Sequence, residues 1–236
     1  MFYECEKLHF LPDFLGWISE IKKDINISHM LYNNKSLIMS RNVLDFLITT
    51  RIRISIMILG SSLVGKTSFV EKFLYGISHR EDKPTIGVNP YFHKLKIDEL
   101  KNILTFNILD TNCTSTLFSI VKGFFKQNDI FILLFKRDNK NSFYDLDRYI
   151  ENIRRIKGKK FNNIFIIANR FDFSNEREIE MDEIKKKCKN NRLTWIGEIN
   201  LKTCSKKELE NMIINSIFTL QNLARFFFGK FDKIVE

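Results

Sequence analysis

The sequence predicts a three-layer α/β domain, in which a mostly parallel sheet of six strands has helices on both faces. Short, fully apolar runs such as residues 130–135 and 164–168 are typical of strands that are buried on both sides. Longer amphipathic segments separate these runs. Strands that alternate with helices form a parallel sheet, because each return connection needs a crossover along one face.

The first 50 residues precede this pattern and are predicted to form a mainly helical extension. Trp17, Ile18, Ile21 and Ile25 have roughly helical spacing, and a second helix is predicted around residues 43–48. The segment is too apolar for a free tail, so we expect it to pack on the main domain or to bind a partner.

The main domain is predicted to span residues 51–223, followed by a tail at residues 224–236. Ser142 is expected to cap one helix, and Ser205 with Glu208 fits the capping-box pattern at the start of the last helix. The predicted strands are 52–59, 91–97, 103–109, 130–135, 164–168 and 193–196, and the predicted helices are 66–75, 116–126, 142–156, 179–188 and 205–223.

The loop after the first strand carries the clearest functional signal. Gly60-Ser61-Ser62-Leu63-Val64-Gly65-Lys66-Thr67 fits the phosphate-binding loop pattern, and Ser68 follows it into the helix. Glycines let such a loop wind around an oxyanion, and the positive end of the helix adds to the field of the backbone N–H groups. Lys66 is expected to reach the outer phosphates, and the Thr67 hydroxyl suits Mg²⁺.

Composition and charge narrow the class of protein. The net charge of +10 comes partly from lysine runs at 157–160 and 185–187 without interleaved aromatics, which indicate a solvated face rather than a nucleic-acid groove. Contact of this basic face with an anionic membrane remains open. The four cysteines are scattered, without metal-type or disulfide spacing, and no apolar segment is long enough to span a bilayer. We therefore expect a reduced, cytoplasmic chain, peripheral on intracellular membranes if it contacts them.

Four further signals follow the loop in order along the chain. They are Pro84-Thr85-Ile86-Gly87-Val88, Asp110-Thr111, Asn169-Arg170-Phe171-Asp172 and, more weakly, Asn200-Leu201-Lys202. Gly60, Asp110 and Asn169 each end or follow a predicted strand, so they should meet at the carboxyl edge of the sheet. Together the motifs resemble a small GTPase of the Ras superfamily, closest to the Rab branch, over about residues 52–222.

This resemblance implies a three-layer P-loop NTPase fold of the small G domain type, with GTP or GDP and Mg²⁺ as ligands. Thr67, Thr85 and Asp110 are the implied Mg²⁺ ligands, and Thr85 also meets the γ-phosphate. Asp172 would accept two hydrogen bonds from the guanine edge, with Asn169, Arg170, Leu201 and Lys202 completing the base site.

The residues after Asp110-Thr111 correspond to the segment called switch II in the family, and they depart from its pattern. Asn112-Cys113-Thr114 stands where the family has Ala-Gly-Gln, so the γ-phosphate sensor and the water-orienting glutamine are both replaced. We therefore expect weak GTP hydrolysis and assign no catalytic residue. A pseudo-GTPase interaction module is the alternative. The loop alone also allows an ATP-using enzyme, against which the guanine-type spacing of Asn169 and Asp172 argues.

The family resemblance further implies protein effectors or regulators and a switch role in vesicle traffic or signalling. The sequence shows no prenylation box, so membrane contact would need a partner or the basic face. We expect a monomer or a component of a complex, with no nucleic-acid partner.

Overall fold

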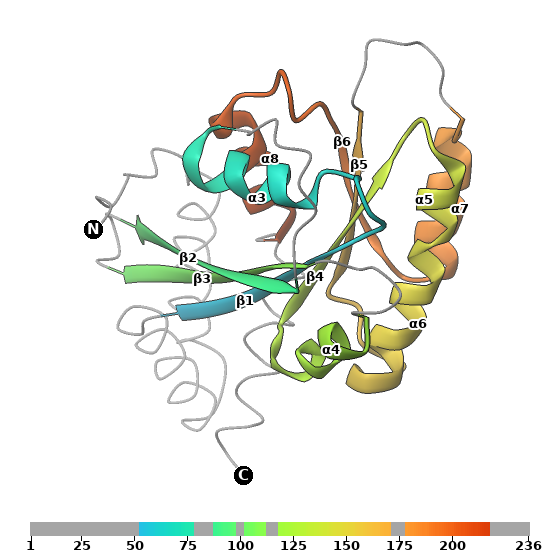
Figure 1. Ribbon diagram of the computed structural model, residues 1–236, viewed down its shortest axis with the longest axis horizontal. Helices are drawn as coiled ribbons and strands as arrows, with labels where there is room; N and C mark the ends of the chain where they lie inside the picture. Colours follow the sequence, from blue (N-terminus) through green and yellow to red (C-terminus); the bar gives the residue numbers. More distant parts are fainter. Residues whose placement is uncertain (1–51, 78–86, 98–101, 112–117, 171–177, 218–236) are drawn as a thin grey trace, which may run out of the picture. The chain divides into compact units, whose positions relative to one another are not determined.

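The computed structural model describes residues 52–77, 87–97, 102–111, 118–170 and 178–217, which Figure 1 draws in colour. The chain divides into two compact units, Met1–Arg53 with His93–Phe106, and Ile54–Phe92 with Asn107–Glu236. The described part of the first unit consists of strand residues, at 52–53, 93–97 and 102–106. The second unit contains the phosphate-loop sequence, and the predicted extension and tail lie outside the described residues.

Six strands form the sheet in the order β2-β3-β1-β4-β5-β6. The pairs β1–β4, β4–β5 and β5–β6 are parallel, in agreement with the prediction from the apolar runs. The strands are β1 (Ile52–Leu59), β2 (Val88–Ile97), β3 (Asn102–Thr111), β4 (Ile130–Lys136), β5 (Ile164–Asn169) and β6 (Thr194–Ile199).

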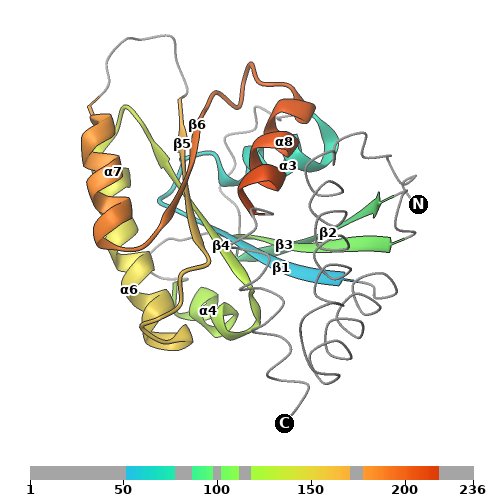
Figure 2. The ribbon, with the colours of Figure 1, turned by 180° about the vertical axis from the view of Figure 1, so that it is seen from behind.

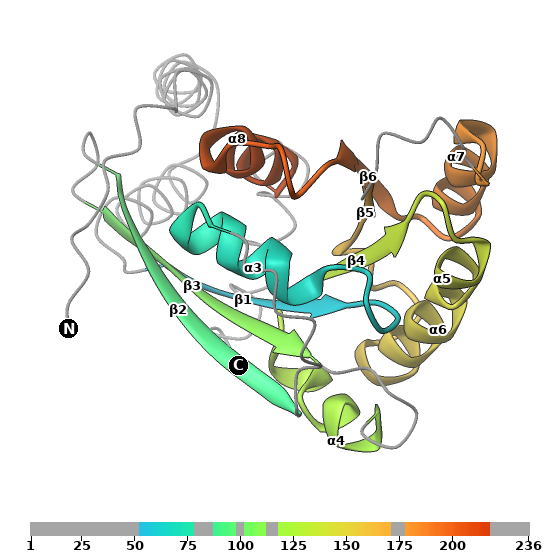
Figure 3. The same cartoon turned by 45° about the horizontal axis from the view of Figure 1, so that its top comes forward.

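The helices of the second unit lie on both faces of its strands. Helices α3 and α8 lie together on one face, and α4 to α7 lie on the other, as Figures 1, 2 and 3 show from three sides. The helices are α3 (Lys66–Tyr75), α4 (Phe118–Gly123), α5 (Lys140–Tyr144), α6 (Leu146–Lys157), α7 (Met181–Asn190) and α8 (Lys206–Ile217), with a short 3₁₀ helix at Phe125–Gln127.

The pleat of β4 explains why this strand reads as continuously apolar. Phe131, Leu133 and Phe135 belong to the core cluster on the α4 to α7 side, where Phe125 meets Phe131 edge to face at 5.2 Å between ring centroids. The even-numbered residues alternate to the opposite face and are also buried. A strand covered on both faces has no position for a polar side chain until it ends.

One predicted helix cap is wrong. Asn139, not Ser142, is the N-cap of α5, because its Oδ1 accepts the Ser142 N–H at 3.0 Å. The Ser142 hydroxyl instead turns back and donates to Asn139 O at 2.7 Å. The predicted single helix is divided at Asp145 into α5 and α6.

The other described boundaries agree with the sequence prediction to within a few residues, and the predicted end of the last helix, 218–223, lies outside the described residues. The capping box of α8 is confirmed, since the Glu208 N–H donates to Ser205 Oγ at 3.1 Å and the Ser205 N–H to Glu208 Oε2 at 3.4 Å. The predicted helix at 116–126 is shorter, with α4 followed by the 3₁₀ turn.

Candidate functional site

The loop from Gly60 to Thr67 needs its two glycines for different reasons. A Cβ on Gly60 would lie 2.2 Å from the Leu134 carbonyl oxygen, so only glycine lets the loop leave β1 this close to β4. Gly65 has φ +94° and forms the N-cap of α3 in the left-handed region. Leu63, although not glycine, also has a positive φ of 61° and is exposed at the outside of the loop.

Lys66 lies folded against this loop. Its Nζ donates to Gly60 O at 2.9 Å and to Ser61 O at 2.7 Å, and the side chain is 8% exposed. The ammonium is therefore held at the loop backbone rather than in solvent. An anion wrapped by the loop would meet this charge together with the N-terminus of α3.

Thr67 and Asp110 form a compact pair of oxygen groups beside the loop. The Thr67 hydroxyl donates to Asp110 Oδ2 at 2.6 Å, and Asp110 is fully buried at the end of β3. Thr111 fixes this strand end by donating to Ile58 O at 2.7 Å. A hydroxyl and a carboxylate are the hard donors that Mg²⁺ takes in phosphate sites, so these residues fit that ion.

The negative charge of Asp110 also acts on the hydroxyl of Tyr91 in β2. Burial raises the pKa of its hydroxyl, and the carboxylates of Asp110 and Glu71 raise the pKa further. A phenol with the ordinary pKa of 10 is already protonated at neutral pH, and this shift keeps it so.

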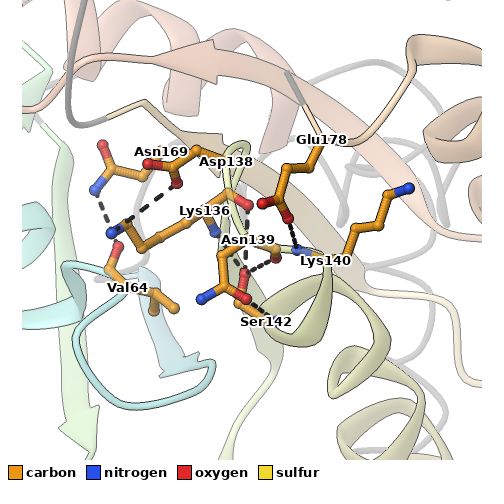
Figure 4. Close-up of polar contacts among 8 residues, drawn as sticks. All are labelled: Val64, Lys136, Asp138, Asn139, Lys140, Ser142, Asn169 and Glu178. Carbon is orange, nitrogen blue, oxygen red and sulfur yellow. Dashed lines mark hydrogen bonds and ion pairs between the residues drawn. The ribbon is translucent and has the colours of Figure 1, made fainter. Parts of the chain in front are cut away.

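Asn169 joins three of the predicted motifs. Its Nδ2 donates to Val64 O of the phosphate loop at 2.9 Å, as Figure 4 shows, and its Oδ1 accepts the Leu201 N–H at 3.5 Å. The side chain is fully buried, so neither contact competes with bulk water. Asn169 therefore ties the predicted base site to the phosphate loop.

The remaining described base residues lie around this bridge. Arg170 donates its backbone N–H to Ile199 O at 2.8 Å, and its guanidinium lies 3.9 Å from Glu198. Leu201 is buried, whereas Lys202 is exposed and donates its N–H to Asn200 Oδ1 at 3.0 Å. The N–H of Leu201, a residue of the predicted base site, donates to Asn169 Oδ1.

The sequence analysis did not identify two side chains at the carboxyl edge of the sheet, those of Asp145 and Lys136. Ser61 Oγ donates to Asp145 Oδ2 at 2.6 Å, which ties the loop to the junction of α5 and α6. Lys136, the last residue of β4, points toward Val64 and Asn169 in Figure 4, with its Nζ 4.0 Å from Asp138 Oδ1. The rule that located Asp110 and Asn169 at strand ends would also have found Lys136.

Several predicted residues lie outside the described part of the chain. These are Thr85, Asp172 and the segment 112–114, so their predicted roles stay predictions. Ser68 lies in the first turns of α3. Within the described ranges, no three His, Cys, Asp or Glu side chains are grouped to hold a metal ion, and no helix has the length and apolarity to cross a bilayer.

Comparison with known proteins agrees with this geometry. The family model described as "Ras family" matches residues 55–219. Ras-like protein 1 of Saccharomyces cerevisiae is 27% identical over 128 residues, which are 54% of this chain and 40% of that protein. The match thus spans less than half the length of this curated relative.

Proposed function

Because this chain belongs to the Ras family, we propose that it is a Rab-like guanine-nucleotide switch that binds GTP and GDP with Mg²⁺. The observation that carries the proposal is the Asn169 side chain, which links the phosphate loop at Val64 to the base-motif backbone at Leu201. A plain phosphate site does not need this link. A nucleotide site does, because base and phosphates must be held at a fixed separation.

Each group has a defined task in the proposed binding mode. The loop backbone and Lys66 hold the β- and γ-phosphates, while Asp172 accepts hydrogen bonds from the guanine edge and Arg170 lies near the purine. Thr67, Thr85 and Asp110 would hold Mg²⁺, which neutralises charge on the phosphate oxygens when it is bound. Asp110 already accepts the Thr67 hydroxyl, so the two oxygens lie side by side before the ion arrives.

Hydrolysis is proposed to be slow. The family glutamine that orients the attacking water is replaced by Thr114, and the preceding glycine by Cys113. Glutamine-bearing relatives hydrolyse GTP unaided at only about 10⁻⁴ s⁻¹. We propose a lower intrinsic rate here, so that a partner would have to supply the water-orienting group.

The same replacement favours one alternative, a pseudo-GTPase that keeps the fold and does not cycle nucleotide. In both cases, effectors or regulators would bind the protein. We propose a role in vesicle traffic or signalling because Pro84-Thr85-Ile86-Gly87-Val88 resembles the switch I sequence of Rab proteins. Peripheral membrane contact through the basic face belongs to the same proposal.

The test is the nucleotide carried by freshly purified protein, released by denaturation and identified by chromatography. Lys66→Ala removes the loop ammonium, and Lys207→Ala, an exposed lysine on α8, is the matched control. We expect stoichiometric guanine nucleotide in wild type and control and its loss in Lys66→Ala. Excess GTP over GDP would support slow hydrolysis. Absence of nucleotide, with no binding of added GTP, would refute the switch and favour the pseudo-GTPase.

A further inference from the structure

The carboxyl ends of β4, β5 and β6 carry a buried arginine that no motif predicted. Arg137 directly follows β4, and its side chain is only 2% exposed. Its Nη1 donates to Glu198 Oε2 at 3.2 Å. Within the described part of the chain, its Nε and Nη2 are buried without a hydrogen-bond partner. Glu198 is thus the one carboxylate that compensates this charge among the described residues.

Glu198 also lies next to the predicted base motif. Its second oxygen, Oε1, is 3.9 Å from Arg170 Nη1. Each carboxylate oxygen therefore has its own guanidinium: Arg137 from inside the domain and Arg170 from the base-motif side. Arg170 is 32% exposed and Glu198 20%, so the pair lies at the surface while Arg137 anchors it from below.

The backbone holds these three side chains in place. The Arg137 N–H donates to Asn169 O at 3.1 Å, and the Arg170 N–H donates to Ile199 O at 2.8 Å. Glu198 pairs with Ala168 in the β5–β6 register. Three strand ends are thus joined both by main-chain bonds and by one shared carboxylate.

We infer that Glu198 is a positioning residue for nucleotide binding, which holds Arg170 beside the base and is itself oriented by Arg137. A buried guanidinium with a single carboxylate partner fixes that carboxylate, since losing the contact would leave a buried charge uncompensated. The fixed carboxylate then limits the side-chain freedom of Arg170. This inference rests on the proposed guanine-nucleotide function and extends it to Arg137 and Glu198, which the motifs predicted from the sequence do not include.

The test is a double-mutant cycle on the dissociation rate of fluorescent GDP with Mg²⁺ present. Glu198→Gln keeps the shape and removes the charge, and Arg170→Gln removes the held group. We expect each single variant to release GDP about three- to tenfold faster than wild type. This factor corresponds to the loss of an ion pair that contributes about 1 kcal/mol. The double variant should be no faster than either single variant, because Glu198 acts through Arg170.

Glu210→Gln is the matched control, since it removes a partly buried carboxylate from the Lys206 ion pair on α8. It should leave GDP release unchanged. Should Glu198→Gln fail to fold because of the lone Arg137 charge, Arg137→Met removes that charge, and the cycle is run in this background. Failure of the Arg137→Met/Glu198→Gln protein to fold would make the pair purely structural and overturn the inference.

The outcomes separate the two proposals. Wild type that binds no guanine nucleotide overturns both of them. Wild type that binds GDP, with an unchanged rate in Glu198→Gln or with additive effects in the double variant, overturns the positioning role alone. Faster release that is non-additive with Arg170→Gln establishes it.

Discussion

Replacing Asn169 by alanine should weaken both folding and nucleotide retention. The substitution leaves the Val64 carbonyl without its 2.9 Å donor and the Leu201 N–H without its 3.5 Å acceptor, in a position that is fully buried. An unsatisfied buried polar group costs about 1–3 kcal/mol. The longer second contact falls at the low end of that range, so we expect a loss of about 3 kcal/mol in the free energy of unfolding.

Asn163→Ala is the matched control for this prediction. Asn163 also donates through its Nδ2, to Asp129 O at 3.3 Å, but at the amino edge of the sheet, away from the loop. Its loss should cost about 1 kcal/mol and leave the nucleotide bound. For a domain of this size, about 3 kcal/mol corresponds to a melting temperature lower by about 6–12 °C.

The assays are thermal denaturation and the dissociation rate of bound nucleotide. Asn169→Ala should melt well below Asn163→Ala and should release nucleotide faster than wild type. Equal melting temperatures for the two variants would show that the Asn169 contacts do not stabilise the loop. Unchanged nucleotide release would refute the link between base motif and phosphate loop.

Three further changes give separate tests. Gly60→Ala forces a Cβ to within 2.2 Å of Leu134 O, so urea denaturation should show a loss of about 3 kcal/mol or more; a loss below about 1 kcal/mol would contradict the clash. Thr67→Ala should abolish the slowing of nucleotide release by Mg²⁺, which Thr67→Ser should retain because it keeps the hydroxyl that meets Asp110; equal Mg²⁺ effects in both variants would argue against a metal role. Burial raises the pKa of the Cys188 thiol from 9.0 to about 11, so the unfolded chain loses this proton first and the free energy of unfolding should fall as pH rises from about 9 to about 11. Cys188→Ala should lack this component, and parallel pH profiles for the two proteins would rule it out.

The fold was largely predictable because the relevant signals are local. Helix α3 was predicted with its observed bounds, since glycines stand at both ends and each adopts the left-handed region, at φ +94° for Gly65 and +73° for Gly76. The apolar runs of β4 and β5 identify buried strands without any knowledge of their partners.

The features that the sequence did not predict correctly depend on competition between neighbouring residues or on contacts between residues distant in sequence. Asn139 and Ser142 are both good cap residues within one turn, and the sequence does not say which side chain accepts the N–H. Arg137 stands in a charged stretch, Lys136-Arg137-Asp138, that reads as an ordinary solvated turn. Its burial depends on Glu198, 61 residues away, and therefore on the register of three strands.

The end of β4 places two cations one residue apart in different surroundings. Lys136 points toward the phosphate loop at Val64 (Figure 4), while the Arg137 guanidinium meets Glu198. Arg137 is the first residue after the strand, and the two charges lie near different carboxylates, Asp138 for Lys136 and Glu198 for Arg137. A deletion of one residue in β4 would shift the Arg137 guanidinium to the place of Lys136 at the loop and the Lys136 ammonium to the buried place of Phe135. The length of β4 therefore determines which cation lies at the loop, and this strand should tolerate apolar substitutions far better than any insertion or deletion.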